Sequence, residues 1–434
     1  MKRMLKIVGC AMLTSVMFFS CAEEDCPTCP VGDATDTTDT VDDTMPAAPT
    51  TYEFVDADGA STVSYSGQVV RNLIINDIKS QVTADPTMLT SMYSNDATNQ
   101  ARAIFTTTSP SSVQTTYGDI SSKSVSGKIA TNGTTTCEVD DCTVYGYGSD
   151  PATLIPAWFT AAASGQYTAD GMDIPQMVQK LLMGAVSYYQ GTTHYIGSID
   201  TDDNTDIVEG KNYTEMAHHW DESFGYFGAA VDYASYTDAE LSGGTTTKDS
   251  NNDSSIDFLS EVCLGISINA GKRDNGAAGS DSDFTKTIFD AYVMGRHLIA
   301  NNADVADILV QRDIIANEWE KLFAANTIHY INDTIDDIDG TWTGTETAAC
   351  TSDTDLCQDY SKHWSEMRAF AMALNFNSMK TISDGILQTV YDYLGTAPVF
   401  PGEGDVAAYR ADLLLARDLL QSAYGFSDAT VAAW

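Results

Sequence analysis

Along most of this chain, apolar side chains recur every three or four residues, the spacing that places them on one face of an α-helix. The first such run has apolar residues at Val69, Val70, Leu73, Ile74 and Ile78. The spacing predicts helices over residues 68–82, 151–163, 173–191, 213–233, 256–272, 283–301, 303–338, 356–375, 378–394 and 405–424. No long stretch alternates polar with apolar positions as a strand does. The pattern therefore predicts an all-α protein of the bundle type.

Three stretches lack this helical spacing. Residues 52–67 are punctuated by glycine and predict extended chain or loop. Residues 83–150 are rich in serine, threonine and glycine and predict short helices joined by long loops. Residues 21–50 contain many Asp, Thr and Pro residues and almost no large apolar side chain, a composition typical of a disordered tether.

The N-terminus has the pattern of an export signal. A basic segment precedes a mainly apolar stretch, residues 7–19. The cysteine that follows, Cys21, stands where a lipobox would end, and we expect it to carry a lipid anchor. Residues 1–20 are then the signal peptide, and the protein is anchored in the cell envelope, with the outer membrane, facing the periplasm or the cell surface, favoured. The alternative is a plain secretory signal with an incidental cysteine.

The overall charge narrows the range of partners. The chain has 61 acidic residues against 22 Lys and Arg, a formal net charge of −39. Such a surface repels nucleic acid and attracts cations, so we expect no nucleic-acid partner.

The cysteines fit an oxidising compartment. Cys137 and Cys142, and likewise Cys350 and Cys357, are close pairs in polar sequence, and we expect each pair to form a small-loop disulfide. Cys263 is left over within an apolar stretch predicted to be helical, and we expect a buried thiol there.

Candidate chemistry concentrates in one predicted helix, around the string HHWDE. Glu215, His219 and Glu222 are spaced so that they form one stripe along a helix. A second predicted helix repeats the same offsets with Asp359, His363 and Glu366. The tryptophan after the histidine recurs too, as Trp220 and Trp364. This recurrence indicates an internal duplication, which we expect to form two helical bundles, residues 51–300 and 301–434.

Histidine and glutamate on facing helices are how bundle cores bind iron, manganese or zinc. The predicted metal ligands are His219, Glu222, His363 and Glu366, with Glu215 and Asp359 as nearby acids. The alternative is that these side chains satisfy one another in a polar core.

The strings HHWDESFGYFG and HWSEMRAFAMALNFN resemble the imelysin-like family of bacterial exported proteins, and more narrowly a subgroup of lipoproteins of unknown function with an HHWDE–FGYFG motif. The family signature Gly-x-His-x-x-Glu falls on Ala217, His219 and Glu222, with alanine in place of the glycine. The resemblance implies two pseudo-symmetric bundles with a site between them. It also implies either peptidase activity or a role in periplasmic iron uptake.

Three functions remain open. The first is binding of a metal ion or a metal-containing ligand between the repeats, for iron uptake or sensing with an envelope partner. The second is a metal-dependent peptidase or other hydrolase that uses Glu222 or Glu366 as base. The third is a structural or partner-binding lipoprotein. The absence of an HExxH string argues against a standard zinc protease. Whether the protein is an enzyme stays open, and a protein that is not an enzyme is favoured.

One acidic loop alternates oxygen-bearing side chains in the manner of a calcium loop. Its candidate ligands are Asp249, Asn251, Asp253, Ser255 and Asp257. Ser254 stands where an EF-hand has glycine, so a calcium site and a solvated loop remain two hypotheses. For a similar run over residues 200–206 we expect a solvated loop.

Overall fold

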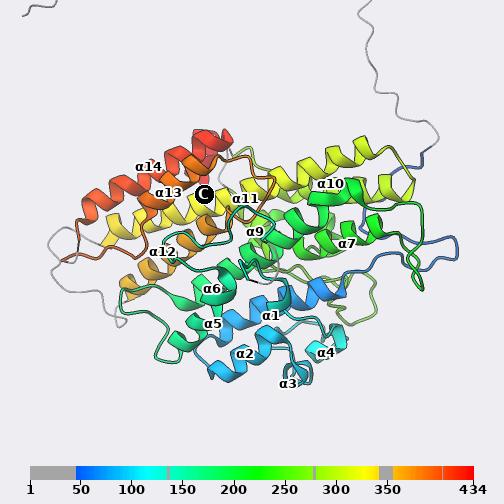
Figure 1. The fold of residues 1–434 in the computed structure, drawn as a ribbon, viewed down its shortest axis with the longest axis horizontal. Helices are drawn as coiled ribbons and strands as arrows, with labels where there is room; N and C mark the ends of the chain where they lie inside the picture. Colours follow the sequence, from blue (N-terminus) through cyan, green and yellow to red (C-terminus); the bar gives the residue numbers. More distant parts are fainter. Residues whose placement is uncertain (1–44, 134–136, 277–279, 342–354, 403) are drawn as a thin grey trace, which may run out of the picture. The chain divides into compact units, whose positions relative to one another are not determined.

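The computed structural model describes residues 45–133, 137–276, 280–341, 355–402 and 404–434. Within them, Ala47–Trp434 forms one compact unit. Every extended pairing in this part of the chain is an isolated bridge, and all the named elements are helical, which confirms the all-α prediction (Figure 1). Cys21 and nearly all of the expected signal and tether lie outside the described residues.

The α-helices are α1 Ser66–Gln81, α2 Pro86–Ser94, α3 Ala97–Gln100, α4 Tyr117–Ile120, α5 Pro151–Ala162, α6 Ile174–Leu182, α7 Glu215–Phe227, α8 Asp238–Ser242, α9 Ile266–Asp274, α10 Phe284–Ala300, α11 Val305–Thr341, α12 Asp355–Ala373, α13 Asp384–Leu394, α14 Val406–Tyr424 and α15 Asp428–Ala433. Three short 3₁₀ elements are η1 Ser126–Lys128, η3 Ile196–Thr201 and η4 Tyr233–Ser235. The element η2, Met183–Tyr195, is a π-helix that continues α6. None of these helices is long and apolar enough to cross a membrane.

Three predicted helices are shorter than expected. The one over residues 378–394 begins only at Asp384, where the Ser383 hydroxyl caps the helix by accepting a hydrogen bond from the N–H of Ile386. The one over residues 213–233 ends at Phe227, because Gly228 adopts the left-handed conformation that closes a helix. The one over residues 256–272 is helical only from Ile266 onward. Upstream of Ile266, the buried Glu261 accepts hydrogen bonds from the backbone N–H groups of Ser250 and Asp257, so the chain there forms a loop.

The prediction for Cys263 was partly wrong, because this residue lies in the same loop. Its thiol is free and buried, as expected, but the residue lies in the loop before α9 and not on a helix.

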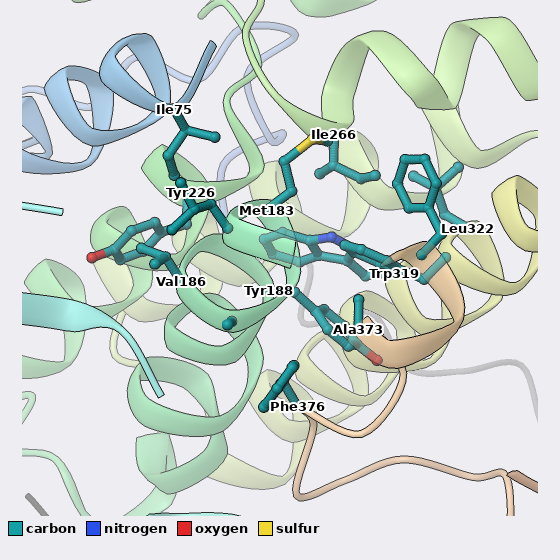
Figure 2. Packing of buried hydrophobic residues seen from close by; sticks show 14 of the residues in the cluster. Ile75, Met183, Val186, Tyr188, Tyr226, Ile266, Trp319, Leu322, Ala373 and Phe376 are labelled. Atoms are coloured by element: carbon teal, nitrogen blue, oxygen red, sulfur yellow. The ribbon is translucent and has the colours of Figure 1, made fainter. Parts of the chain in front are cut away.

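The core forms where η2, α7, α11 and α12 meet. The ring of Tyr188 stacks on Phe323 with centroids 4.6 Å apart, and Figure 2 shows Tyr188 close to Trp319 and Ala373. Glycine in η2 permits this packing: a Cβ on Gly191 would lie 2.7 Å from the Trp319 ring. The glycine in η2 therefore leaves room for the ring of Trp319, which packs beside Tyr188 at the centre of the unit.

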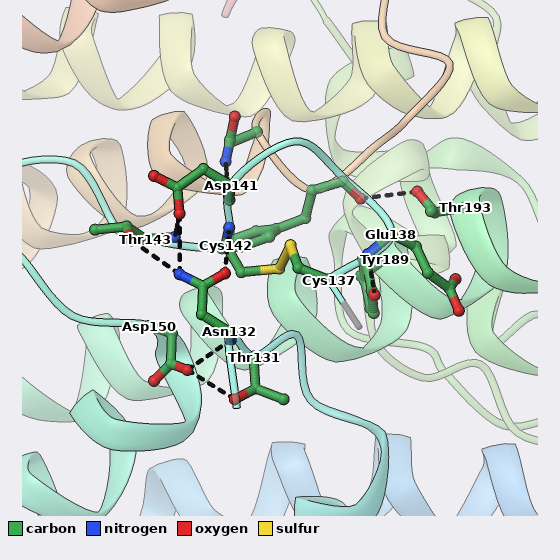
Figure 3. Close-up of a disulfide and its surroundings, with 12 residues drawn as sticks. Thr131, Asn132, Cys137, Glu138, Asp141, Cys142, Thr143, Asp150, Tyr189 and Thr193 are labelled. Atoms are coloured by element: carbon green, nitrogen blue, oxygen red, sulfur yellow. Dashed lines mark hydrogen bonds between the residues drawn. A yellow bond between two sulfur atoms is a disulfide. The ribbon is translucent and has the colours of Figure 1, made fainter. Parts of the chain in front are cut away.

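The disulfide between Cys137 and Cys142 is present, as predicted (Figure 3). Beside it, Asp150 accepts hydrogen bonds from Thr131 Oγ1 and from the N–H of Asn132, and it also caps the start of α5. The disulfide loop is thus attached to α5. In the other predicted pair, Cys350 lies outside the described residues.

The domain boundary expected at residues 300–301 lies in the turn between α10 and α11, and these two helices pack against each other. The structure does not establish the pseudo-symmetric two-bundle arrangement, although it does repeat individual contacts around the two histidine stripes.

Candidate functional site

The first stripe lies on α7, which starts at an N-cap: the Thr214 hydroxyl accepts a hydrogen bond from the N–H of Ala217. One face of α7 is fully buried through Trp220 and Phe224. His219 lies off that face, and its side chain is 30% exposed. The stripe therefore borders solvent and can be reached by a ligand.

The imidazole of His219 is oriented by an aspartate outside its own helix. Its Nδ1 lies 2.7 Å from Oδ2 of Asp202, a residue just after η3. This hydrogen bond is the main reason why the pKa of His219 is raised above its usual value. Because Nδ1 is engaged, Nε2 is the nitrogen with which His219 can bind a ligand.

Glu222, one turn further along α7, is half-buried beside α1. Its Oε1 accepts a hydrogen bond of 2.7 Å from Nε2 of Gln68. Its Oε2 lies 3.8 Å from Nε2 of His218, whose ring stacks on Tyr213. These two partners of Glu222 are thus a neutral amide and an imidazole. We refer to Asp202, His219, Glu222 and Gln68 as the first cluster.

The second stripe repeats the histidine contact on α12. Nδ1 of His363 lies 2.8 Å from Oδ2 of Asp337, and its Nε2 lies 3.8 Å from Oδ2 of Asp333. Burial lowers the pKa of His363, but the hydrogen bond to Asp337 and the negative charges of Asp337 and Asp333 together outweigh it and leave the pKa raised.

Glu366, by contrast, has a charged partner. Oε1 of Glu366 lies 2.8 Å from Nζ of Lys180 and accepts a hydrogen bond of 3.1 Å from the hydroxyl of Tyr330. Lys180 and Glu366 are buried, at 7% and 3% exposure. Burial raises the pKa of Glu366, and the ammonium of Lys180 more than reverses that shift. We refer to Asp337, His363, Glu366 and Lys180 as the second cluster.

The two aspartates that orient the histidines were missed by the sequence analysis, although a signal for them exists. The string His-Tyr-Ile occurs at residues 194–196 and again at residues 329–331. Asp202 and Asp337 follow these two strings at the same offset. In both cases the tyrosine ring lies beside the histidine of the stripe. The duplicated pattern therefore includes the helix before each stripe as well as the stripe itself.

The other two predicted acids lie apart from the histidines of their stripes. Glu215 is exposed and accepts a weak hydrogen bond of 3.4 Å from the N–H of Asp203. Asp359 is exposed near the start of α12.

The structure does not bring the four predicted ligands into mutual contact. α7 packs mainly on η2, α10 and α1, whereas α12 packs mainly on α11 and α6. No hydrogen bond or ion pair joins the two clusters in the described part of the chain, and no group of three or more His, Cys, Asp or Glu side chains there is arranged to hold a metal ion. The two clusters are therefore separate candidate sites.

The carboxylates of the acidic loop at residues 249–257 accept hydrogen bonds from the loop's own backbone and from Gln114. Asp249 accepts hydrogen bonds from the N–H groups of Asp253 and Ser254, and Asp257 accepts one from Nε2 of Gln114. Asp253 in turn accepts one from the N–H of Ser255. These bonds account for the loop conformation, and the calcium site stays a prediction.

Comparison with known proteins gives one match. No curated protein and no solved structure matches the chain. A protein-family model, described as domain of unknown function (DUF4856), matches residues 49–351, which include α7 and the first cluster. These comparisons do not identify the imelysin-like family, so that resemblance stays a prediction. Since the match extends over most of the sequence, the chain belongs to the family described as domain of unknown function (DUF4856).

Proposed function

We propose that the protein binds a metal ion, or a ligand that contains one, at the first cluster, with Nε2 of His219 and the carboxylate of Glu222 as ligands. The Asp202–His219 hydrogen bond carries this proposal, because histidines that bind metals almost always donate their other ring nitrogen to a carboxylate or carbonyl group. Imidazole and carboxylate ligands suit iron, manganese or zinc.

Two protein ligands leave most of the coordination sphere to water or to a chelator that arrives with the metal. Such a site holds its ion weakly enough to release it, which suits uptake or sensing better than a permanent cofactor. The expected export signal and lipid anchor at Cys21 support a role in the cell envelope, where an anchored protein would pass a metal such as iron to a partner.

The second cluster is a poorer cation site. Its glutamate, Glu366, is already paired with the ammonium of Lys180, and an incoming cation would have to displace a buried charge. Glu222, by contrast, accepts a hydrogen bond from the neutral amide of Gln68, and the imidazole of His218 lies 3.8 Å from its other oxygen. The proposal therefore assigns the metal to the first cluster alone.

The Asp202→Asn variant tests the importance of the Asp202–His219 hydrogen bond. Asp202→Asn should weaken metal binding by about 10–100-fold, because the imidazole loses the carboxylate that orients it and raises its basicity. Elemental analysis and calorimetric titration of the full chain with Fe²⁺, Mn²⁺ and Zn²⁺ measure this effect. His219→Ala should abolish binding to the same site.

Asp337→Asn is the matched control, since it makes the same change beside His363 in the second cluster. It should leave metal affinity unchanged. Equal losses in both aspartate variants, or no binding of any of the three ions to the wild type, would refute the assignment. Hydrolysis of a peptide panel that stops on chelation would point instead to a metal-dependent peptidase.

The affinity for metal should also change with pH, and the effect of Asp202 on His219 determines the direction of that change. Asp202 raises the pKa of His219, so the protonated imidazole persists above the usual value of about 6.5 and competes with the metal. Affinity should therefore fall as the pH is lowered through that raised pKa. In Asp202→Asn the fall should occur at a lower pH. Titrations over the neutral and mildly acidic range measure both midpoints, and identical midpoints would contradict the role given to Asp202.

A further inference from the structure

Basic side chains are scarce in this chain, yet three lysines meet at one cavity. Lys79 of α1, Lys180 of α6 and Lys272 of α9 all line a cavity of about 180 Å³. The chain contains only 22 Lys and Arg residues against 61 acids. A single carboxylate, that of Glu366, lines the same cavity. The lining therefore carries an excess of positive charge in a strongly acidic protein.

Glu366 is not able to neutralise all of these lysines. It pairs with Lys180, whose Nζ also donates to the side-chain oxygens of Gln176 and Gln179. Lys79 forms no ion pair with a carboxylate of the described residues. Burial, followed by repulsion from Lys180, lowers the pKa of Lys79 to about 7. The amine of Lys79 is thus only partly protonated near neutral pH, and an anion bound beside it would stabilise its ammonium form.

A second observation also points to a missing anion. Arg273 follows Lys272 on α9 and is 6% exposed, and its Nε and Nη1 have no hydrogen-bond partner in the described structure. Its charge acts on Tyr330 and Glu366, which both line the cavity. Buried guanidinium groups are normally hydrogen-bonded, so Arg273 leaves two donors near the cavity that the described residues do not satisfy, and Oε2 of Glu366 likewise lacks a donor.

We propose that this cavity binds a small organic anion through a carboxylate or phosphate group, with Lys79 and Lys272 as its main electrostatic partners. The side chain of Asn269, also in the lining, adds a neutral polar group. Ammonium groups hold oxyanions as point charges, and they do so more strongly where burial removes competing water.

The part of the ligand beyond its acidic group has room in a second cavity. This second cavity adjoins the one of about 180 Å³, which we call the inner cavity. A larger cavity of about 600 Å³ shares Asn76 and Lys79 with the inner one. Its lining is mostly polar, with hydroxyls such as those of Ser80 and Thr106 and amides such as that of Gln166. Lys79 stands at the junction of the two cavities. An acidic group can therefore bind inside while a polar body occupies the outer space.

This site is independent of the proposed metal site. It includes none of the residues of the first cluster, and from the second cluster it includes only Lys180 and Glu366. Failure of metal binding would leave the anion proposal unaffected, and the reverse also holds.

The test uses inorganic phosphate and acetate as probes, with chloride at equal ionic strength as the reference. Thermal unfolding and calorimetric titration of the full chain are measured for the wild type, Lys79→Met and Lys286→Met. Lys286 is the matched control, because its exposed side chain on α10 pairs with Asp290 and the variant has the same change in net charge. Phosphate or acetate should raise the Tm of the wild type and of Lys286→Met above the chloride value. Lys79→Met should weaken that binding at least tenfold.

Lys272→Met provides a second variant in the lining of the cavity. Because Lys272 is exposed, we expect this variant to fold, and it should also weaken binding. The relative affinities of phosphate and acetate identify which acidic group the natural ligand carries. If neither probe raises the Tm above the chloride value, or if Lys79→Met and Lys272→Met bind as tightly as Lys286→Met, the proposal is wrong.

Discussion

Asp221→Ala should lower the free energy of unfolding by about 3–5 kcal/mol, the usual result of removing one partner from a buried ion pair. Asp221 is the aspartate of the HHWDE string and is completely buried. Its Oδ1 lies 2.8 Å from Nε of Arg296, and that guanidinium is itself only 3% exposed. Burial raises the pKa of Asp221 to about 6, and Arg296 opposes that rise, so the carboxylate is charged at neutral pH. The variant would leave the buried Arg296 without its carboxylate.

The same carboxylate also holds the N-terminal segment of the unit. The Tyr52 hydroxyl donates a hydrogen bond of 2.9 Å to Oδ1 of Asp221, and the N–H of Ser64 donates one of 3.3 Å to Oδ2. Arg296 extends the network by donating to the hydroxyl and the carbonyl of Thr62. The variant should therefore loosen the segment from Tyr52 to Ser64 in addition to lowering global stability, which hydrogen exchange can show.

Chemical denaturation followed by circular dichroism measures the main effect, and a double-mutant cycle shows its origin. Asp221→Leu/Arg296→Met should lose much less stability than Asp221→Leu or Arg296→Met alone, because it removes both charges together. Asp290→Ala, which breaks the exposed pair with Lys286, should change stability little. Additive losses at residues 221 and 296 would show that the pair is not coupled, contrary to this account.

The helices were predictable because their apolar spacing is a local property of the sequence. α1, α10 and α14 begin and end within a few residues of the predicted limits. The start of α9 was not predictable in this way. The preceding loop depends on a side chain, Glu261, that binds backbone groups up to eleven residues away. Apolar spacing contains no information on such a contact.

In the candidate site, too, features set by local spacing were predictable from the sequence, and contacts between distant residues were not. The i, i+3 spacing correctly placed His219 and Glu222 one turn apart on α7, and it did the same for His363 and Glu366 on α12. What distinguishes the two clusters is Lys180, which comes from α6 and neutralises Glu366. Only the fold brings that lysine to α12, so the sequence could not show that the second glutamate is already paired.

The second large effect is expected in the core, where Trp319→Ala should cost about 3–5 kcal/mol. Trp319 is fully buried on α11, its ring lies edge-on to Phe227 with centroids 5.5 Å apart, and it also lies close to Tyr188 (Figure 2). Its Nε1 has no hydrogen-bond partner in the described structure, so the loss should come from packing alone. Thermal and chemical unfolding measure the effect.

The contact between Trp319 and Gly191 of η2 allows the packing explanation to be tested with a second substitution. Gly191→Ala places a methyl group about as close to the indole as the 2.7 Å expected for its Cβ, and overpacking of this kind costs about 1–3 kcal/mol. If the indole is the obstacle, the same methyl group should cost far less in the Trp319→Ala background, where it partly fills the new cavity. The two losses would then be strongly non-additive. Simple additivity would mean that Gly191 is required for the π-helical backbone of η2 itself and not for the approach of Trp319.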